Sequence, residues 1–416
     1  MTIIKHIVER HRLFLPFVIL FPLLPALFKT LVASFGDISS YYQLYYFIGY
    51  QYGFGGRKLL GTIFSHMLPY HVGHKQILPI IWSINAIFLI LLISFISNGL
   101  KHSINQNIGL SLFFVYAMWF VSPFSISSYF SQGVNLMYPE IWSMTLVLVF
   151  LFIHRYYRDK WWYYLSSIVI CLICCLIHHI FCCLFFPLVF SLFINDLFGV
   201  EANRKELAKK TFAYGFISLL LLIVFVAIWK FSTMNTDLNT LYEAIIRRTA
   251  PDVCSHDKEA IEQMYFISNI DNTINQSTNF HRRTIELVLT IIALAPLIFI
   301  LIYPWILTIK ASTSKSTRYK YLLVALIPTV LHIPIYFFAV DYGRWEYAWF
   351  FNYICLLVFF VWNNDSGIVD ALNKICNKMK NNPIVLISAF LYLAALPAST
   401  AWYIPEIHKF ADILIR

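Results

Sequence analysis

The sequence predicts an all-α fold, a polytopic bundle of transmembrane helices in which residues 1–416 form a single integral membrane domain. Hydrophobic residues make up 59% of the chain and charged residues 12%, against about 25% charge in a soluble domain. Apolar runs of about 20 residues recur, which is the length that a helix needs to cross a bilayer. The formal charge of +10 lies in short clusters between these runs, a pattern typical of cytoplasmic loops and not of nucleic-acid binding.

The basic clusters predict the direction of each span, because cytoplasmic loops carry an excess of Lys and Arg. Lys5, Arg10 and Arg12 place the N-terminus in the cytoplasm, and no small-residue cleavage site follows, so the first apolar run is expected to be retained. About nine spans follow from this pattern, at 13–35, 77–97, 109–127, 138–154, 211–230, 284–309, 321–340, 347–362 and 384–403. The abundance of Phe, Ile, Tyr and Lys is typical of an AT-rich bacterial or phage gene. We therefore expect a bacterial inner membrane, with the C-terminus in the periplasm.

The apolar segment 163–194 is too long for one straight span, and basic clusters at 155–160 and 204–210 flank it on both sides. If both clusters are cytoplasmic, the segment enters and leaves the membrane on the same side. We therefore expect a hairpin or a re-entrant segment that turns near His178 and His179, whose side chains would cap the turn.

The same segment contains cysteines at positions 171, 174, 175, 182 and 183. Cys and His are zinc ligands, but these cysteines point in several directions around a helix, and cysteine is a common small apolar residue in cores. The sequence therefore predicts no metal site, and no cofactor is expected.

Two loops are expected in the periplasm: the first periplasmic loop, 36–76, and a large periplasmic loop, 232–283. The start of span 138–154 and the stretch 341–346 reach the same side of the membrane. Polar groups from distant parts of the chain are thus expected to converge on one face, and we predict a functional site there.

Two carboxylates on this face are candidates for catalysis. Asp37 directly follows the first span, and Glu140 lies just inside the fourth. A carboxylate inside a span is costly and usually faces a cavity or a partner. The alternatives are that Asp37 marks a helix end and that Glu140, after Pro139, favours a helix N-terminus.

Basic residues on the periplasmic face are unexpected, because Lys and Arg in membrane proteins are concentrated in cytoplasmic loops. Arg57 and Lys58 follow the glycines of "YGFGG", and His281 and Arg282 directly precede the span 284–309. Guanidinium binds phosphate through paired hydrogen bonds, so these four residues are candidates for phosphate binding. The alternative is that they rest on anionic lipid headgroups.

The stretch "VDYGRWEYAW" combines an acid and a cation at the mouth of two spans. Asp341 and Arg344 are three residues apart, so they can face the same side of a helix. One interpretation is a salt bridge that joins the two spans. The other is that Asp341 acts as an acid or base and Arg344 holds a phosphate.

A membrane-buried body with carboxylates and phosphate-binding cations on its outer face suits the transfer of a sugar from a lipid phosphate. A base would deprotonate the acceptor hydroxyl, and cations would stabilise the departing phosphate. The sequence contains no nucleotide-binding loop, which makes a nucleotide sugar an unsuitable donor.

This architecture resembles the C-type polytopic glycosyltransferases (GT-C), which have many spans and an acidic first outer loop. The size, the nine spans with a hairpin, the outer C-terminus and the long outer loop are similar to the serotype-converting O-antigen glucosyltransferases encoded by phages and prophages. The resemblance implies undecaprenyl-phosphate glucose as the donor and O-antigen, or a related surface polysaccharide, as the acceptor. Asp37 matches the acidic position of the first loop. That loop lacks the second acid frequent in the family, so Glu140 and Asp341 stay open as alternatives for the base.

Two other functions fit parts of the same pattern. An O-antigen or capsule polymerase has a similar size and location, but usually carries basic residues in two large outer loops. A transporter or flippase for polysaccharide or lipid-linked sugar would bury charges in the middle of its spans. Here the charges gather at one face.

Overall fold

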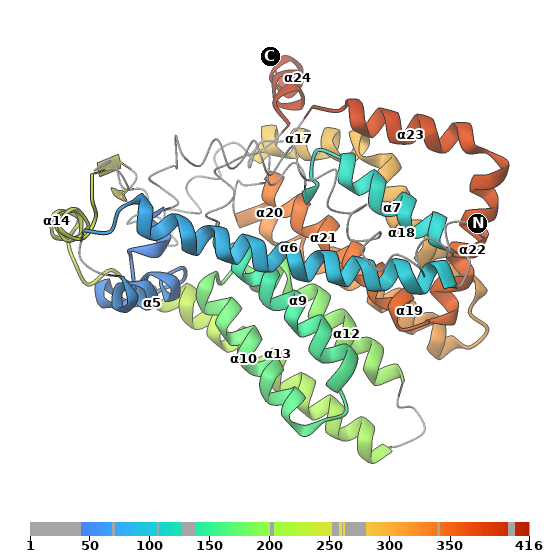
Figure 1. Cartoon of the computed structure of the whole chain (residues 1–416), viewed down its shortest axis with the longest axis horizontal. Coiled ribbons are helices and arrows are strands. Elements are labelled where there is room, and N and C mark those ends of the chain that lie inside the picture. The colour runs from blue at the N-terminus through green and yellow to red at the C-terminus, as the bar shows by residue number, and fades with distance from the viewer. Residues whose placement is uncertain are drawn as a thin grey trace.

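The computed structural model describes residues 43–68, 71–105, 108–126, 138–199, 204–251, 258–259, 261–262, 280–338, 342–397 and 404–415. The predicted first span, Asp37 and Asp341 lie outside the described residues. The described part of the chain is built from helices, and its β-type pairing is limited to an isolated bridge between Val72 and Thr249. The predicted all-α class is therefore confirmed for this part of the chain (Figure 1).

The helices have the following bounds: η2 Leu44–Tyr46, η3 Tyr50–Tyr52, α5 Leu59–Met67, α6 His74–Asn105, α7 Gly109–Val121, α9 Glu140–Tyr157, α10 Trp161–Ile177, α11 Phe181–Leu184, α12 Phe186–Phe198, α13 Arg204–Phe231, α14 Leu238–Arg248, α17 Phe280–Ala293, α18 Ala295–Ala311, α19 Lys315–Val330, α20 Ile335–Phe338, α21 Tyr342–Trp362, α22 Ser366–Asn381, α23 Pro383–Ala395 and α24 Pro405–Ile415.

Three described helices are long and apolar enough to cross a membrane, within α6, α13 and α21. The pair α17 and α18 qualifies as a fourth candidate, with a bend of 71° between its two parts. The helices α7 and α23, predicted as full spans, have 13 residues each, fewer than the 20 or so that a straight span needs. The structure thus supports a membrane protein with three to four candidate spans among the described residues.

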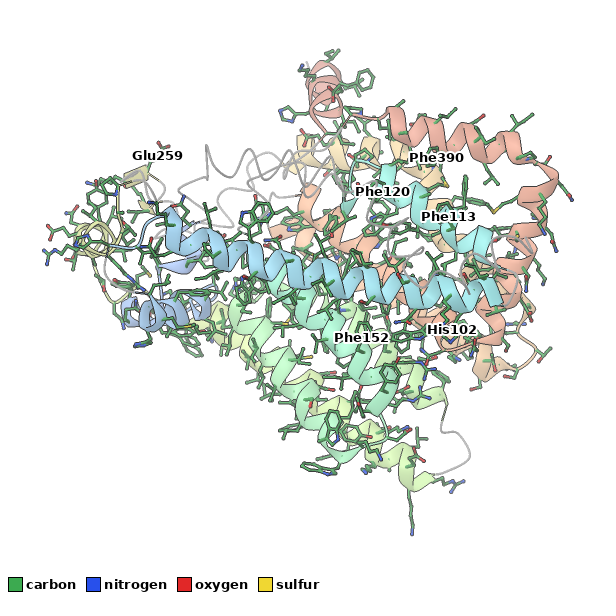
Figure 2. All side chains as sticks on the ribbon, in the orientation of Figure 1. His102, Phe113, Phe120, Phe152, Glu259 and Phe390 are labelled. Carbon is green, nitrogen blue, oxygen red and sulfur yellow. The ribbon has the colours of Figure 1, made fainter. Side chains whose placement is uncertain are left out.

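Helix α21 forms the centre of the bundle. Of its apolar window 94% is buried, against 22% for α13, so α21 is surrounded by protein while α13 presents most of its surface outward. The ring centroid of Trp362 lies 5.3 Å from that of Phe152 of α9 and 5.8 Å from that of Phe95 of α6. Phe152 is labelled in Figure 2, below α6. A helix that is hydrophobic all round suits such a central position.

The segment predicted as a hairpin consists of α10, α11 and α12, with its turn at His178–Ile180. Its two ends meet at the C-terminal end of α9, where His154 lies 2.7 Å from the Tyr163 hydroxyl and 3.6 Å from Asp196. The turn lies at the other end of α9, where His178 is 3.9 Å from Glu140. The segment therefore enters and leaves at one end of the bundle, as predicted.

A buried carboxylate holds the ends of the hairpin together. Asp196 accepts hydrogen bonds from Tyr214 of α13 at 2.8 Å and from Arg158 at 3.3 Å. We call Asp196, His154, Arg158, Tyr163 and Tyr214 the Asp196 cluster. Because its members come from α9, α10, α12 and α13, the cluster fixes these helices to one another.

The two loops predicted on one face contact each other. The amide of Thr233 donates to Phe54 at 2.8 Å, and the amide of Asn235 donates to Tyr52 at 3.0 Å. The Val72–Thr249 bridge joins the last part of the first loop to the residue that follows α14 in the large loop. Each segment also contains a helix, α5 in the first loop and α14 in the large loop, and the two lie at one end of the molecule (Figure 1).

Two regions expected to be loops are helical. Helix α6 continues through Lys101 to Asn105, and Gly99 lets it approach α21, because an added Cβ would lie 2.6 Å from Val358. Helix α22, which contains Lys374 and Lys378, occupies the stretch between the predicted spans 347–362 and 384–403. The reason is amphipathic spacing: its apolar face is buried, and the Asp365 side chain caps its N-terminus by accepting the Ile368 amide.

Candidate functional site

An ion pair between α9 and α21 lies at the centre of the candidate site. Nη1 of Arg344 donates to Oε1 of Glu140 at 2.9 Å. The guanidinium also lies over the ring of Tyr138, 4.2 Å from its centroid. The side chains of Arg344 and Glu140 are only 10% and 8% exposed. The pair is therefore shielded from solvent and held more strongly than an ion pair on the surface.

Glu140 is the first residue of α9, directly after the N-cap residue Pro139. A carboxylate is favoured at a helix N-terminus, so this alternative from the sequence is confirmed, and the structure adds a cationic partner from α21. The other oxygen, Oε2, is buried and accepts no hydrogen bond from any described residue. One oxygen of Glu140 thus holds Arg344 while the second faces the site without a partner in the described chain.

The turn of the hairpin brings two imidazoles to this ion pair. The rings of His178 and His179 are stacked, with centroids 5.6 Å apart and an angle of 5° between their planes. Nε2 of His178 lies 3.9 Å from Oε1 of Glu140. Both ring nitrogens of His178 and Nδ1 of His179 are buried and form no hydrogen bond with the described residues. The last turn of α10 is instead closed by a backbone hydrogen bond, in which the amide of His178 donates to the carbonyl oxygen of Cys174 at 2.9 Å. The expectation that the histidine side chains cap the turn is therefore wrong.

Arg57 reaches the same place from the first loop. Its backbone is left-handed, with φ of 70°, a conformation that is rare for residues other than glycine and is concentrated at functional sites. Nη1 donates to the Tyr45 hydroxyl at 3.2 Å. The guanidinium is close enough to act electrostatically on His178 and His179, and that of Arg344 acts on His178.

Gly56 permits this arrangement, because a Cβ at that position would lie 2.2 Å from Nδ1 of His179. The imidazole thus packs directly against the backbone that carries Arg57. We call Glu140, Arg344, Arg57, His178 and His179 the Glu140 cluster.

A tyrosine and a tryptophan border the cluster. Nε1 of Trp142 donates to the hydroxyl of Tyr46 at 3.3 Å. Burial raises the pKa of Tyr46 well above its ordinary value, and the nearby charge of Glu140 adds to this rise. The phenol therefore stays neutral at physiological pH and presents a polar edge to the site.

Lys58, predicted to bind phosphate, is placed differently from Arg57. Its Nζ donates to the carbonyl oxygens of Gly53 at 3.1 Å, Thr233 at 3.2 Å and Phe54 at 3.4 Å. The residue is 2% exposed, and burial lowers its pKa from 10.5 to about 8. The ammonium group is thus occupied in joining the first loop to the residues that follow α13.

The other predicted site residues are only partly placed. His281 and Arg282 belong to the first turn of α17, but their side chains are outside the described part of the structure. Asp37 and Asp341 are outside it altogether. Of the predicted set, the described structure brings Glu140, Arg344 and Arg57 together.

His178, His179 and Tyr46 were missed as site residues by sequence reasoning. A signal for the histidines was present. If both ends of the hairpin lie at the cytoplasmic side, its turn must reach toward the opposite face, where the loops and Glu140 were expected. Nothing in the run of tyrosines in the first loop distinguishes Tyr46 from its neighbours.

The described residues include no group of three or more His, Cys, Asp and Glu side chains that could hold a metal ion. The cysteines of the hairpin are free thiols, and the sulfurs of Cys175 and Cys182 lie 3.9 Å apart near the turn. The polar side chains of the Glu140 cluster are guanidinium, carboxylate and imidazole groups.

Two guanidinium groups and one carboxylate leave the cluster with a formal charge of +1 while its imidazoles are neutral. A buried site with surplus positive charge and imidazole N–H donors is suited to a small anion, phosphate above all. Comparisons with protein-family models, with curated proteins and with solved structures find no match to this chain.

Proposed function

We propose that the protein is a glycosyltransferase of the bacterial inner membrane. It transfers a sugar, glucose by the resemblance described above, from undecaprenyl phosphate to O-antigen or a related surface polysaccharide in the periplasm. The observation that supports this most is the Glu140 cluster, in which Arg344 and His178 contact one buried carboxylate while His179 and Arg57 lie next to His178. A polyprenyl-phosphate sugar carries one negative charge on its phosphodiester, which matches the surplus charge of +1 in the cluster.

In the proposed mechanism, Arg57 and Arg344 hold the phosphate of the lipid carrier. Glu140 and Tyr138 orient Arg344 before the substrate arrives, through the 2.9 Å hydrogen bond and the 4.2 Å contact with the ring. Such preorganisation lets the guanidinium stabilise charge as it develops, with no reorientation during the reaction. The imidazole N–H groups of His178 and His179 supply further donors to the same anion.

The acceptor hydroxyl oxygen attacks the anomeric carbon of the sugar, and the bond between that carbon and the phosphate oxygen breaks. The bonding electrons leave with the phosphate, which gains a second negative charge at the arginines. The proton of the hydroxyl goes to a carboxylate base. We assign the base to Asp37 or Asp341, because Glu140 is already engaged with Arg344.

The proposed topology is a GT-C-like body of nine spans and the hairpin, with the N-terminus in the cytoplasm and the C-terminus in the periplasm. The contacts between the two loops and the position of the hairpin turn beside them support it. Alkaline phosphatase, which is active only in the periplasm, reports the side of the membrane. A fusion after residue 248 should be active and a fusion after residue 314 inactive.

The function is tested by analysing surface polysaccharide from cells with and without the gene. The proposal predicts a new side-branch sugar on each repeat unit with an unchanged distribution of chain lengths. A change in chain length would indicate a polymerase instead, and accumulation of lipid-linked sugar on one side of the membrane would indicate a transporter.

The same assay with Arg344→Lys tests the site. Lysine keeps the charge but loses the paired hydrogen bonds, so modification should fall about 100-fold, the effect of losing one transition-state donor. The matched control is Arg247→Lys in α14, whose side chain is 77% exposed in an ion pair with Glu243. Equal activity of both variants would remove Arg344 from the site.

A further inference from the structure

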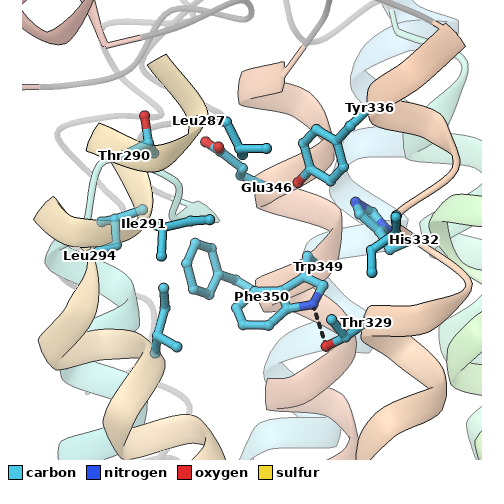
Figure 3. A pocket seen from close by; sticks show the side chains of 12 residues that line it. Leu287, Thr290, Ile291, Leu294, Thr329, His332, Tyr336, Glu346, Trp349 and Phe350 are labelled. Atoms are coloured by element: carbon cyan, nitrogen blue, oxygen red, sulfur yellow. Dashed lines mark hydrogen bonds between the residues drawn. The ribbon is translucent and has the colours of Figure 1, made fainter. Parts of the chain in front are cut away.

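A cavity lies on the opposite side of α21 from the Glu140 cluster. Its volume is about 370 Å³, which is within the range of small-molecule sites. It lies between α17 and α18 on one side and α19, α20 and α21 on the other (Figure 3). The lining residues are Leu287, Thr290, Ile291, Leu294, Ile298, Thr329, His332, Ile333, Tyr336, Glu346, Trp349 and Phe350. Most of this surface is apolar.

Glu346 supplies the exception. It follows Arg344 by two residues, which corresponds to about 200° around a helix, so the two side chains leave α21 in nearly opposite directions. The residue is 7% exposed and borders the cavity (Figure 3). Its carboxyl group forms no hydrogen bond or ion pair with any described residue. A buried carboxyl in this situation is costly unless it meets a proton or a cation.

A second carboxylate lies near the first. Glu286 of α17 is 3% exposed, and its charge acts on Glu346. Glu286 already has a partner, because its Oε1 lies 2.6 Å from Nδ1 of His408 in α24. Glu286 is thus engaged with His408, and Glu346 is the carboxyl group that lines the cavity.

Several other polar groups of the cavity form hydrogen bonds. Nε1 of Trp349 donates to Thr329 at 3.0 Å, as the dashed line in Figure 3 marks, and Thr329 also bonds with Tyr353 at 2.8 Å. Nδ1 of His332 lies 3.1 Å from the carbonyl oxygen of Cys183. Nε2 of His332 is buried and forms no hydrogen bond with the described residues. The cavity thus combines apolar walls, aromatic faces, the carboxyl group of Glu346 and one imidazole nitrogen.

We propose that this cavity binds an amphiphile with an alkyl chain and a protonated primary amine as its head. The amine pairs with Glu346 and lies near the aromatic rings of Trp349 and Tyr336, which attract cations. The alkyl chain occupies the apolar walls formed by α17, α18 and α19. This inference is independent of the proposed glycosyl transfer, because it involves none of the residues of the Glu140 cluster.

The test uses the purified full-length protein in a neutral maltoside detergent, with decylamine, decanol and decanoate as probes. Thermal unfolding should shift to higher temperature with decylamine, less with decanol, and not with decanoate. In Glu346→Gln the apparent affinity for decylamine should fall at least tenfold, to that for decanol. Glu243→Gln, an exposed position in α14, should respond like the wild type.

A second measurement does not depend on how Glu346→Gln folds. A brominated alkylamine quenches nearby tryptophan fluorescence, so 11-bromoundecylamine should quench the wild type more than Trp349→Phe. Ile291→Trp, which narrows the cavity without changing Glu346, should abolish the stabilisation by decylamine. Equal responses to amine and alcohol in the wild type, or unchanged amine binding in Glu346→Gln and Ile291→Trp, would overturn the proposal.

Discussion

The two ends of the hairpin carry two buried polar clusters that differ in how their charges are satisfied. At one end, both oxygens of Asp196 accept hydrogen bonds, from Tyr214 and Arg158, and Nδ1 of His154 pairs with Tyr163, while Nε2 of His154 lies 3.6 Å from Asp196 without a hydrogen bond to the described residues. At the other, one oxygen of Glu140 and the ring nitrogens of His178 have no hydrogen-bonding partner in the described chain. Native proteins satisfy most buried polar groups. The difference indicates that the Asp196 cluster holds helices together, whereas the Glu140 cluster is arranged for a ligand.

The backbone supports the same distinction. Arg57 at the Glu140 cluster has a positive φ, which costs roughly 1–3 kcal/mol and persists where function requires it. In the Asp196 cluster, Asp196, His154, Tyr163 and Tyr214 lie in helices, and Arg158, which directly follows α9, has an ordinary right-handed backbone with φ of −57°. A strained backbone at the Glu140 cluster and a regular backbone at the Asp196 cluster are expected if the first cluster binds a ligand and the second holds helices together.

The largest expected effect comes from removing the charge of the Asp196 cluster. Asp196→Asn weakens the hydrogen bonds from Tyr214 and Arg158, so the free energy of unfolding should fall by about 3 kcal/mol. Activity per folded molecule should stay unchanged. The measurement is thermal unfolding in detergent beside polysaccharide modification normalised to membrane-inserted protein. Loss of activity without loss of stability would contradict the structural role of the Asp196 cluster.

Arg57→Lys should produce the opposite result at the other end. The charge is kept and the two-pronged guanidinium is lost, so activity should fall about 100-fold with little change in thermal stability. Arg158→Lys is the matched control in the Asp196 cluster and should keep its activity. If both substitutions reduced activity equally, the two clusters would not differ in function.

Lys58→Met tests whether the neighbour of Arg57 is structural. Three carbonyl oxygens lose a donor, which should lower the free energy of unfolding by about 2 kcal/mol while activity per folded molecule persists. The pKa of Lys58 is lowered to about 8 in the folded protein. Between pH 8 and the ordinary pKa of 10.5 the unfolded state binds more protons, so stability rises with pH.

The check for Lys58 is the difference in stability between the wild type and Lys58→Met, measured from pH 7 to 10. This difference should widen above pH 8. A constant difference would contradict the assignment of a buried ammonium group.

The smallest effect is expected for Gly56→Ala. An added Cβ would lie 2.2 Å from His179, so the imidazole must move away from the cluster, and we expect about a tenfold loss of activity, equivalent to roughly 1.4 kcal/mol of positioning. Gly215→Ala is the control, because a Cβ there meets nothing within 4 Å. Comparable activity of these two variants would show that the position of His179 is unimportant.

The sequence predicted the parts of the fold that depend on composition and periodicity. Apolar length predicted α13 and α21, and flanking charges predicted that the ends of the hairpin would meet. It could not predict the bend between α17 and α18 or the breaks that leave α7 and α23 with 13 residues each. Such bends and breaks depend on how a helix packs against its neighbours. A short stretch of sequence carries no information about that packing.

The candidate site was predictable where residues broke a rule. Glu140 and Arg57 stood out because charges near spans are costly or misplaced, and the structure places them in one cluster. Lys58 broke the same rule, yet it joins two backbone segments, because the carbonyl oxygens of residues 53, 54 and 233 converge on it. Glu346 lies two residues after Arg344 but borders the cavity between α17 and α21 instead of the Glu140 cluster, because the two side chains leave α21 in different directions.

The central claim is that the Glu140 cluster binds the phosphate of a lipid carrier. The most direct measurement compares binding of undecaprenyl phosphate and undecaprenol to the purified protein in nanodiscs, for the wild type, Arg344→Lys and Arg158→Lys. Our account predicts that the wild type and Arg158→Lys bind the phosphate at least tenfold more tightly than the alcohol, and that Arg344→Lys loses this preference. Equal binding of phosphate and alcohol by the wild type, or a preference that survives in Arg344→Lys, would contradict it.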